Sequence, residues 1–423
     1  MALFIKKSLF SKRIMMFLLF FLINSISVYS ENITLNQCFE KLKENYPILK
    51  NKDYFKNISS IKIENYDKEW MPSLYLRGNI SDQSDAVPRT DRDKYQINFE
   101  IEQIIYEGGI INNQKNYEKE SEISELKKIE IEIYKLKEKV CKIYFDIILA
   151  GEQIKIFENT LKDLKSRLNS VESAVKNGVR LKNDLSLIKS EILTIEQDIL
   201  SKQNRKRALF EILNELTGLK LNEYFDLIYP EIFVSDFENE SGGNRLELSL
   251  YDSEKKKTDI MNGIIATKSK PKINAFLQMG YGKPGLNMFE NIFEKYAVAG
   301  IKFNWKVYDW KTAELEKNIN NNRKQIIETE KEIFRKNIKI SLIELFYEIK
   351  TLEKTIIKDS QNIEIRKEIL ESILSQYNNG IATATEYIIN SNNLLNAKNI
   401  LKIHEVQLKY YLANYKIIRG DEL

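Results

Sequence analysis

The sequence is poor in proline, glycine, cysteine and histidine, and each shortage excludes a class of protein. Its 423 residues include only 6 Pro and 15 Gly, and 43% are hydrophobic, so the chain is neither disordered nor a loop-rich scaffold. The cysteines, Cys38 and Cys141, are too few for a disulfide framework or a thiolate zinc site, and we expect two buried free thiols. One histidine argues against His-rich metal sites and Ser-His-Asp catalysis. We expect no catalytic residue, no cofactor and no metal.

The chain also lacks an excess of charge of one sign. Four of its 65 basic residues lie in residues 1–30, which contain no acidic residue, so the rest of the chain is formally neutral against its 61 acidic residues. Binding to nucleic acid draws most of its strength from neutralised phosphates, and a neutral chain does not fit that role. We expect no nucleic-acid partner.

Residues 1–30 have the pattern of a signal peptide, with a basic start, an apolar run and a small-residue end. Val28 and Ser30 fit the positions that a signal peptidase reads, which predicts cleavage before Glu31. The apolar run, 14–23, is shorter than the roughly 20 residues that span a bilayer, which argues against a membrane anchor. No later stretch is long and apolar enough for a membrane helix. We therefore expect export from the cytoplasm.

The remaining chain consists of two similar copies of one structural unit. Four landmarks recur at offsets of 199, 202, 202 and 202 residues, in the pairs Pro72 and Pro271, Tyr106 and Tyr308, Gly178 and Gly380, and Gly218 and Gly420. A constant offset over the last three pairs indicates a duplication with almost no insertion. Each copy is expected to run as helix, two strands, long helix, tight turn and helix.

Two periodicities support this order. Apolar residues alternate at three- and four-residue spacing from 126 to 175, and the second copy keeps the register over 338–377, interrupted at Asp359 and Arg366. A continuous helix from Gly109 to the turn would be ~100 Å long, so it must pack against other long helices. The strands instead alternate with period two, a pattern that fits a half-buried soluble sheet or a membrane barrel wall. The signal peptide and the long hairpins favour the barrel, which four strands cannot close within one chain.

These patterns divide the chain into four segments. They are a signal peptide at 1–30; a first repeat at 31–218, with strands at about 73–81 and 95–106 and a helical hairpin at 110–217; a connector at 219–243; and a second repeat at 244–423, with strands at about 272–281 and 297–308 and a hairpin at 311–419.

The order of motifs resembles the TolC-like outer-membrane efflux proteins over the whole mature chain. The resembling segments are ITLNQCFEKLKENYPIL (33–49), MPSLYL (71–76), QIIYEGG (103–109) with its counterpart WKVYDW (305–310), and the two Asn-Gly turns. The resemblance implies a mainly α fold with membrane β-structure: a homotrimer with a long coiled-coil α-barrel and one transmembrane β-barrel shared by three chains. It also implies a passive exit duct in the bacterial outer membrane, in a tripartite efflux or type I secretion system. The partners would be a periplasmic adaptor, an inner-membrane pump and outer-membrane lipid, and there would be no enzymatic activity.

The resemblance also implies roles for residues around the two turns. The residues of the two turns would contact the adaptor. The alternative is that they only close the hairpins, because glycine supplies the positive φ of a tight turn. The adaptor-contact residues would be Asn177, Gly178, Val179, Asn379, Gly380 and Ile381. A periplasmic gate would include Asp184, Tyr377 and Glu386, and Ile389 stands where some relatives have another acidic residue. The alternative for the two acids is a helix-start role stabilised by the helix dipole.

Two other functions would predict different features in the sequence. A periplasmic adaptor would have one hairpin per chain beside Gly/Val-rich segments, and a structural coiled coil of the envelope would not need four amphipathic strands. GYGKPG at 280–285 matches a dinucleotide-binding pattern, but no βαβ unit surrounds it, and we interpret it as a loop between strands.

Overall fold

A computed structural model describes residues 32–84, 92–232, 245–287 and 289–421. The predicted signal peptide (1–30) and residues 233–243 of the predicted connector lie outside these ranges. None of the helices within the described ranges is both long enough and apolar enough to pass through a membrane.

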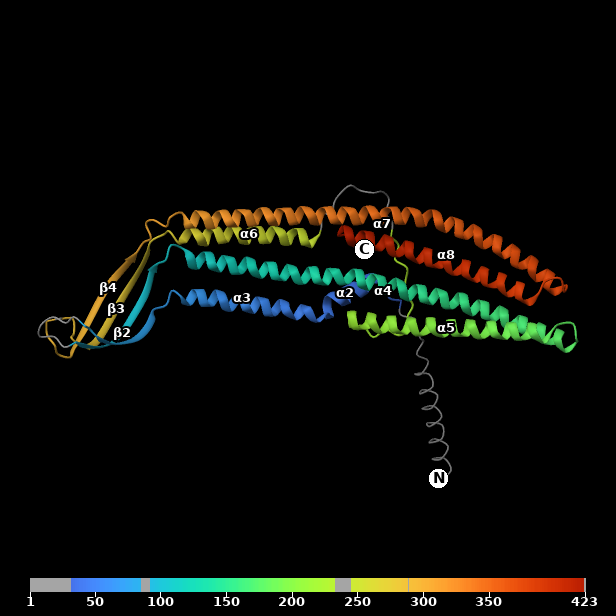
Figure 1. Cartoon of the computed structure of the whole chain (residues 1–423), viewed down its shortest axis with the longest axis horizontal. Coiled ribbons are helices and arrows are strands. Elements are labelled where there is room, and N and C mark those ends of the chain that lie inside the picture. Colours follow the sequence, from blue (N-terminus) through green and yellow to red (C-terminus); the bar gives the residue numbers. More distant parts are fainter. Residues whose placement is uncertain (1–31, 85–91, 233–244, 288, 422–423) are drawn as a thin grey trace, which may run out of the picture. The chain divides into compact units, whose positions relative to one another are not determined.

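The elements follow the expected order twice (Figure 1). The first copy consists of α2 (Leu35–Asn45), η1 (Pro47–Leu49), α3 (Lys50–Lys68), β1 (Ser73–Asp82), β2 (Asp93–Tyr106), α4 (Ile110–Lys176) and α5 (Lys182–Thr217). The second consists of α6 (Leu246–Thr267), β3 (Lys272–Lys283), β4 (Glu294–Asn304), α7 (Thr312–Asn378) and α8 (Ala384–Arg419). Helices α4 and α7 have 67 residues each, and α5 and α8 have 36 each. The mainly α, duplicated fold class is confirmed.

The chain forms two compact units. The first, which we call the tip unit, comprises the described residues of Met1–Glu40, Ile143–Glu231 and Gln361–Val406. The second, the sheet unit, comprises the described residues of Lys41–Lys142, Ile232–Ser360 and Gln407–Leu423. Because α2, α4, α7 and α8 cross the boundary, each unit contains parts of both sequence repeats.

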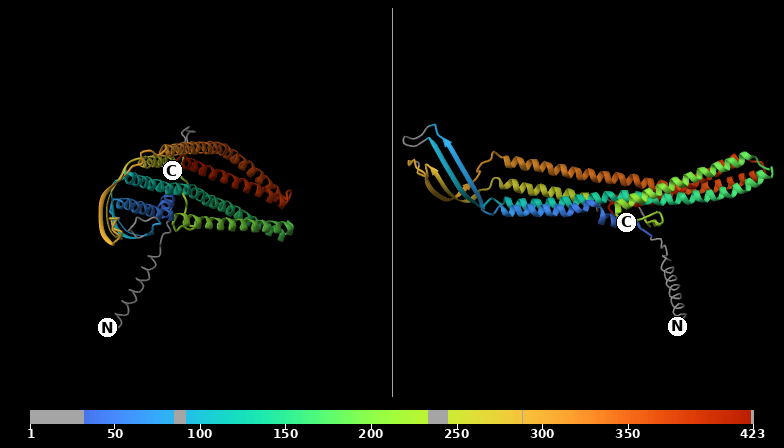
Figure 2. Two further views of the ribbon diagram at one scale, coloured as in Figure 1. Left: turned by 60° about the vertical axis from the view of Figure 1, so that its left-hand side comes forward. Right: turned by 90° about the horizontal axis from the view of Figure 1, so that it is seen from below.

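In the tip unit, four helical segments pair as two hairpins, α4 with α5 and α7 with α8 (Figures 1 and 2). Their apolar seams form one cluster that includes Leu164, Ile188, Tyr377 and Leu395. The three- and four-residue spacing produces this core, because it places the apolar residues of each helix on one stripe. The start of the described chain is also fixed here: Ile33 bridges Leu227, and the buried Tyr144 hydroxyl lies 2.7 Å from the carbonyl oxygen of Ile33.

In the sheet unit, the strands form one antiparallel sheet in the order β1-β2-β3-β4. The right-hand view of Figure 2 shows the strands next to one another. The central β2–β3 pairing joins the two repeats. Period-two alternation gives the sheet one apolar face and one polar face. On the polar face Arg77 forms an ion pair with Glu100 at 2.8 Å.

The GYGKPG segment corrects the sequence interpretation, because Gly280 and Gly282 belong to β3 and not to a loop. A Cβ atom at Gly280 would collide with the ring of Tyr296, whose hydroxyl donates to Asn98 Oδ1 at 2.6 Å. A Cβ atom at Gly282 would lie 2.7 Å from the Tyr95 carbonyl oxygen. These glycines therefore allow close packing across strands.

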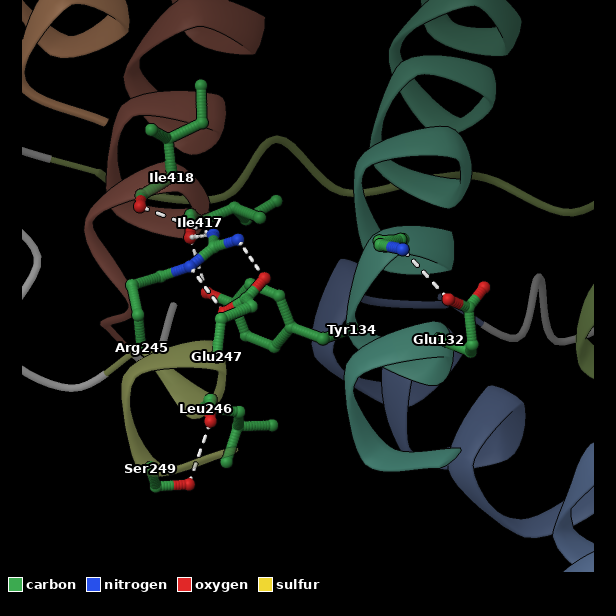
Figure 3. Close-up of polar contacts among 9 residues, drawn as sticks. Glu132, Tyr134, Arg245, Leu246, Glu247, Ser249, Ile417 and Ile418 are labelled. Carbon is green, nitrogen blue, oxygen red and sulfur yellow. Dashed lines mark hydrogen bonds and ion pairs between the residues drawn. The ribbon is translucent and has the colours of Figure 1, made fainter. Parts of the chain in front are cut away.

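A buried arginine that the sequence analysis did not single out fixes the end of α8 in the sheet unit (Figure 3). Arg245 precedes α6, and its guanidinium lies 4.7 Å from the ring centroid of Tyr134. It donates to the carbonyl oxygens of Ile417 and Ile418 and pairs with Glu247 at 2.5 Å. The last carbonyls of a helix have no partner within the helix, so Arg245 satisfies them from a neighbouring segment.

Candidate functional site

The two hairpin turns of the tip unit have the same backbone. Gly178 and Gly380 adopt φ values of +72° and +79°. Val179 donates to the carbonyl oxygen of Ala174 at 2.9 Å, and Ile381 donates to that of Gln376 at 2.9 Å. This six-residue bond is the Schellman arrangement that ends a helix at a left-handed residue. Asn177 and Asn379 precede the glycines, so the six predicted adaptor-contact residues form two equivalent turns.

Both turns carry exposed apolar side chains. Val179, Leu181 and Ile381 are 74%, 73% and 76% exposed. Among the described residues, and apart from each glycine's own chain neighbours, no atom lies within 4 Å of a Cβ built on Gly178 or Gly380, so the surface around both glycines is open in the single chain. An open apolar turn at the end of a long hairpin is a suitable contact surface for another protein.

Tyr377, a predicted gate residue, lies between the two hairpins. It is 3% exposed and stacks on Tyr387, with ring centroids 5.8 Å apart. Arg180, from the first turn, places its guanidinium 4.0 Å from the Tyr377 ring centroid and donates to the Tyr377 carbonyl oxygen. Arg180 therefore links the first hairpin to the end of α7. We call the Arg180–Tyr377 contact the tip latch.

The latch contains groups that sequence reasoning missed. Arg180 had no assigned role; its 202-residue counterpart is Ala382, so a difference between the copies was the available signal. Arg167 lies 6.0 Å from the ring centroid of Tyr387. Burial raises the pKa of both Tyr377 and Tyr387, which keeps the two hydroxyls protonated. The Tyr377 hydroxyl is buried and has no hydrogen-bond partner within the described ranges.

The two predicted gate acids occupy different environments. The Asp184 side chain is largely buried, and its Oδ2 lies 4.0 Å from Arg180 Nη1, so Asp184 lies next to the tip latch. Glu386 instead accepts from the backbone N–H of Thr383 at 2.7 Å and from its hydroxyl at 3.0 Å, while its own N–H donates back to that hydroxyl at 3.2 Å. This is a capping box at the start of α8. The hydrogen bonds hold the pKa of Glu386 below its usual range.

Reactive or metal-binding groups do not gather around these turns. Over the described ranges, no three His, Cys, Asp or Glu side chains are grouped as metal ligands would be. Cys38 and Cys141 are buried and free, and burial raises the pKa of Cys38 to about 12, so that thiol stays protonated. The turns therefore offer an apolar contact surface and a charged contact between the two hairpins.

Comparison with known proteins gives a consistent result at the level of structure. Neither a family model nor a curated protein matches the sequence. Solved structures do match: CusC has 14% identity and a TM-score of 0.71, covering 93% of this chain and 94% of its own. The outer membrane protein VceC from Vibrio cholerae has 14% identity and a TM-score of 0.68, covering 92% of this chain and 96% of its own. The MtrE outer membrane channel of Neisseria gonorrhoeae has 14% identity and a TM-score of 0.64, covering 92% of this chain and 89% of its own. At these identities the likeness establishes the fold, and this chain has the fold of the TolC-like outer-membrane channels.

Proposed function

We propose that the protein is the outer-membrane channel of a tripartite efflux or type I secretion system. Three copies form a passive exit duct, and the duct receives substrates from an inner-membrane pump through a periplasmic adaptor. The predicted signal peptide is consistent with export to that compartment. The observation that carries the proposal is the apolar face of the sheet.

That face is exposed along its length. Its large exposed side chains are Leu74, Leu76, Ile80, Tyr95, Ile97, Phe99, Met279, Tyr281, Ile301 and Phe303. A tilted strand needs about 9–11 residues to cross a bilayer, and β1, β2, β3 and β4 have 10, 14, 12 and 11. An exposed apolar face of this size is a liability in water and a requirement in lipid.

The unpaired edges of the sheet also favour an assembly of several copies of the chain. β1 and β4 each pair on one side only, so one edge of each strand has unpaired backbone groups. Open edges do not occur in hydrocarbon, because nothing there satisfies the backbone groups. Joining β4 of one copy to β1 of the next removes every edge, and three copies give a barrel of twelve strands.

An uncovered helical seam also supports several copies. On α7, large apolar residues recur every seven positions and are 52–67% exposed: Ile319, Ile326, Ile333, Ile340 and Tyr347. On α3, Tyr54, Ile58 and Ile61 are exposed at four- and three-residue spacing. Heptad seams of this kind are buried by a second helix. In the proposed trimer, α7 of one copy covers α3 of its neighbour and so closes the coiled-coil α-barrel.

The turns receive their roles within this duct. The exposed Val179, Leu181 and Ile381 meet the adaptor, together with the turn residues Asn177, Gly178, Asn379 and Gly380. The tip latch, with Asp184, keeps the two hairpins of each copy together when the duct is closed. Glu386 acts through its capping box, which fixes the direction in which α8 leaves the second turn.

A charge on the apolar face tests the membrane assignment. Phe99→Arg should cost roughly 2–4 kcal/mol if the side chain faces lipid, and should deplete the trimer in the outer membrane. The matched control is Gln278→Arg on the polar face, opposite Glu100, which should insert normally. Normal trimer yield for Phe99→Arg, measured on unheated gels of isolated outer membranes, would contradict the proposed function.

A further inference from the structure

Two lysines interrupt the apolar face of the sheet, and both lie beside the hairpin loops. Lys283 pairs with Tyr95, and Lys295 pairs with Tyr281. Directly paired residues share a face, so both lysines lie on the face of Ile97 and Met279. The other lysines of the strands, Lys94, Lys272 and Lys302, lie on the polar face by the same alternation. The positive charge of the apolar face is therefore concentrated at one end.

Aromatic rings surround these lysines. Tyr281 and Phe293 stack with centroids 5.5 Å apart, and Tyr95 lies 6.3 Å from Phe293. All three rings are 39–51% exposed. Tyrosine and tryptophan collect where apolar lipid meets headgroups, because such rings have an apolar body and a polar edge. We call the five residues Tyr95, Tyr281, Lys283, Phe293 and Lys295 the rim cluster.

A shallow apolar groove leads away from the rim cluster. It has a volume of about 660 Å³ and is lined by Leu76, Ile97, Phe99, Met279, Ala297 and Lys295, among others. A second hollow of about 590 Å³ adjoins it over Gly78, Ile80 and Tyr281. Gly78 faces Ile97 without a side chain, and a Cβ there would meet only the Gln96 carbonyl oxygen, at 3.9 Å. The small methyl group of Ala297 in the groove, and the absence of a side chain at Gly78 in the adjoining hollow, leave room for an acyl chain.

We propose that the rim cluster and this groove bind a phosphorylated, acylated sugar lipid of the outer leaflet. Lys283 and Lys295 are diagonal neighbours, whose Cβ atoms lie roughly 7–8 Å apart. Two flexible ammonium groups at that separation converge on one phosphate, and the stems of both lysines lie along the apolar surface. The acyl chain fills the groove beneath them.

The charges around the cluster favour this placement. No ion pair joins Lys295 to an acidic residue in the part of the chain that the structure describes, whereas Lys283 already has an interaction partner. Asp82 and Asp93 pair with one another on the same face, at the β1–β2 end. Asp93 of β2 is a diagonal neighbour of Lys283, whereas Lys295 lies one strand further from Asp93, on β4. Because the negative charge of Asp93 repels a phosphate, the phosphate is held on the β3–β4 side. The proposal rests on the proposed function, which places the hairpin loops at the cell surface.

Binding of purified lipid A to the detergent-solubilised trimer tests the site. Lys283→Gln and Lys295→Gln should each weaken binding about five-fold, and the double variant should lose more. Lys302→Gln removes a lysine of β4 from the polar face and should leave binding unchanged. Lipid A without its phosphates should bind weakly to all of these proteins alike.

Three results would overturn the site: wild-type affinity in the double variant, equal loss in Lys302→Gln, or equal affinity for the dephosphorylated lipid. Membrane fractionation of the same strains separates this failure from failure of the proposed function. Protein absent from the outer membrane contradicts the function and the site together. Protein present there as a trimer without phosphate preference overturns the site alone.

Discussion

The two hairpin turns share a backbone and differ in their polar chemistry. Both end a 67-residue helix at a left-handed glycine and begin a 36-residue helix. The first turn supplies Arg180, which reaches the other hairpin. The helix that follows begins at Lys182, and its N-cap residue, Leu181, forms no side-chain cap. The second turn supplies Thr383 and Glu386, whose side chains form the capping box with each other. The first copy thus has the tip latch through Arg180, and the second copy has the capping box of Thr383 and Glu386.

This difference indicates how one motif can serve two purposes. A turn that satisfies its own helix start holds its shape without help from its surroundings. A turn whose charged side chain bonds a neighbour depends on that neighbour's position. The two turns therefore differ in what stabilises them: a contact with the other hairpin for the first, and its own helix cap for the second.

Bulk at the turn glycines should have the largest effect. Gly178→Trp or Gly380→Trp covers the open turn surface and should abolish export while the trimer remains in the outer membrane. Gly→Ala at the same position imposes the strain of a positive φ without the bulk, and is the matched control. Export by each variant is measured as resistance to a pump substrate. Unchanged export by both Trp variants would remove the docking role.

Reversing the charge of Arg180 should have the next largest effect. Arg180→Glu removes a charged hydrogen bond worth about 2 kcal/mol, so the fraction of separated hairpins should rise roughly 30-fold. Single-channel recordings in planar bilayers should then show more frequent or larger openings. Lys182→Glu makes the same charge change at an exposed neighbour and should conduct as the wild type. Identical records for the two variants would show that the latch does not hold the duct closed.

Making the second turn resemble the first should have a smaller, local effect. Thr383→Leu removes the cap and should cost about 1 kcal/mol of helix stability. Amide exchange in the first turn of α8 should quicken about five-fold. Thr385→Leu, which makes the same change two residues further along and inside α8, should leave the exchange rate unchanged. A conductance change as large as that of Arg180→Glu would contradict the division of roles.

The same cap predicts a pH dependence. The pKa of Glu386 is lower in the folded protein than its ordinary value of 4.5, so the cap stabilises α8 above that pH. The stabilisation is lost as the pH falls through the folded-state pKa. Amide exchange at the start of α8 should therefore quicken in acid for the wild type, and Glu386→Gln should remove this dependence.

Removing the Tyr377 hydroxyl should have the smallest effect. The hydroxyl has no partner within the described part of the chain, and Tyr377→Phe keeps both the stacking on Tyr387 and the contact with Arg180. Stability should change by less than about 1 kcal/mol. Tyr377→Ala, which removes the ring, should open the latch as Arg180→Glu does. A strong effect of Tyr377→Phe would indicate that a neighbouring copy bonds the hydroxyl.

The fold was accessible from the sequence because it rests on regular spacing. Three- and four-residue repeats, period-two alternation and turn glycines are local signals, and the constant offset supplied the duplication. The GYGKPG segment was misread because its glycines accommodate Tyr296 and the Tyr95 backbone, which come from other strands. No local pattern reports such an approach.

The contacts of the candidate site were harder to predict from the sequence, because they join residues that are far apart in the chain. The contact of Arg180 with Tyr377 joins residues 197 positions apart, and only packing brings them together. The role of Glu386 was readable, since Thr383 stands three residues before it in a capping-box pattern. Arg245 also escaped notice, because the carbonyls that it caps belong to residues 417 and 418.

Extraction of the full chain from isolated outer membranes tests the central claim most directly. We predict that the protein stays with the outer membrane in high salt and at alkaline pH and dissolves only in detergent. We also predict that it runs as a trimer on gels until heated, because twelve shared strands leave no edge at which one copy can separate. A protein released by salt, or one that is monomeric in unheated detergent, would contradict the duct and favour a coiled-coil protein of the periplasm.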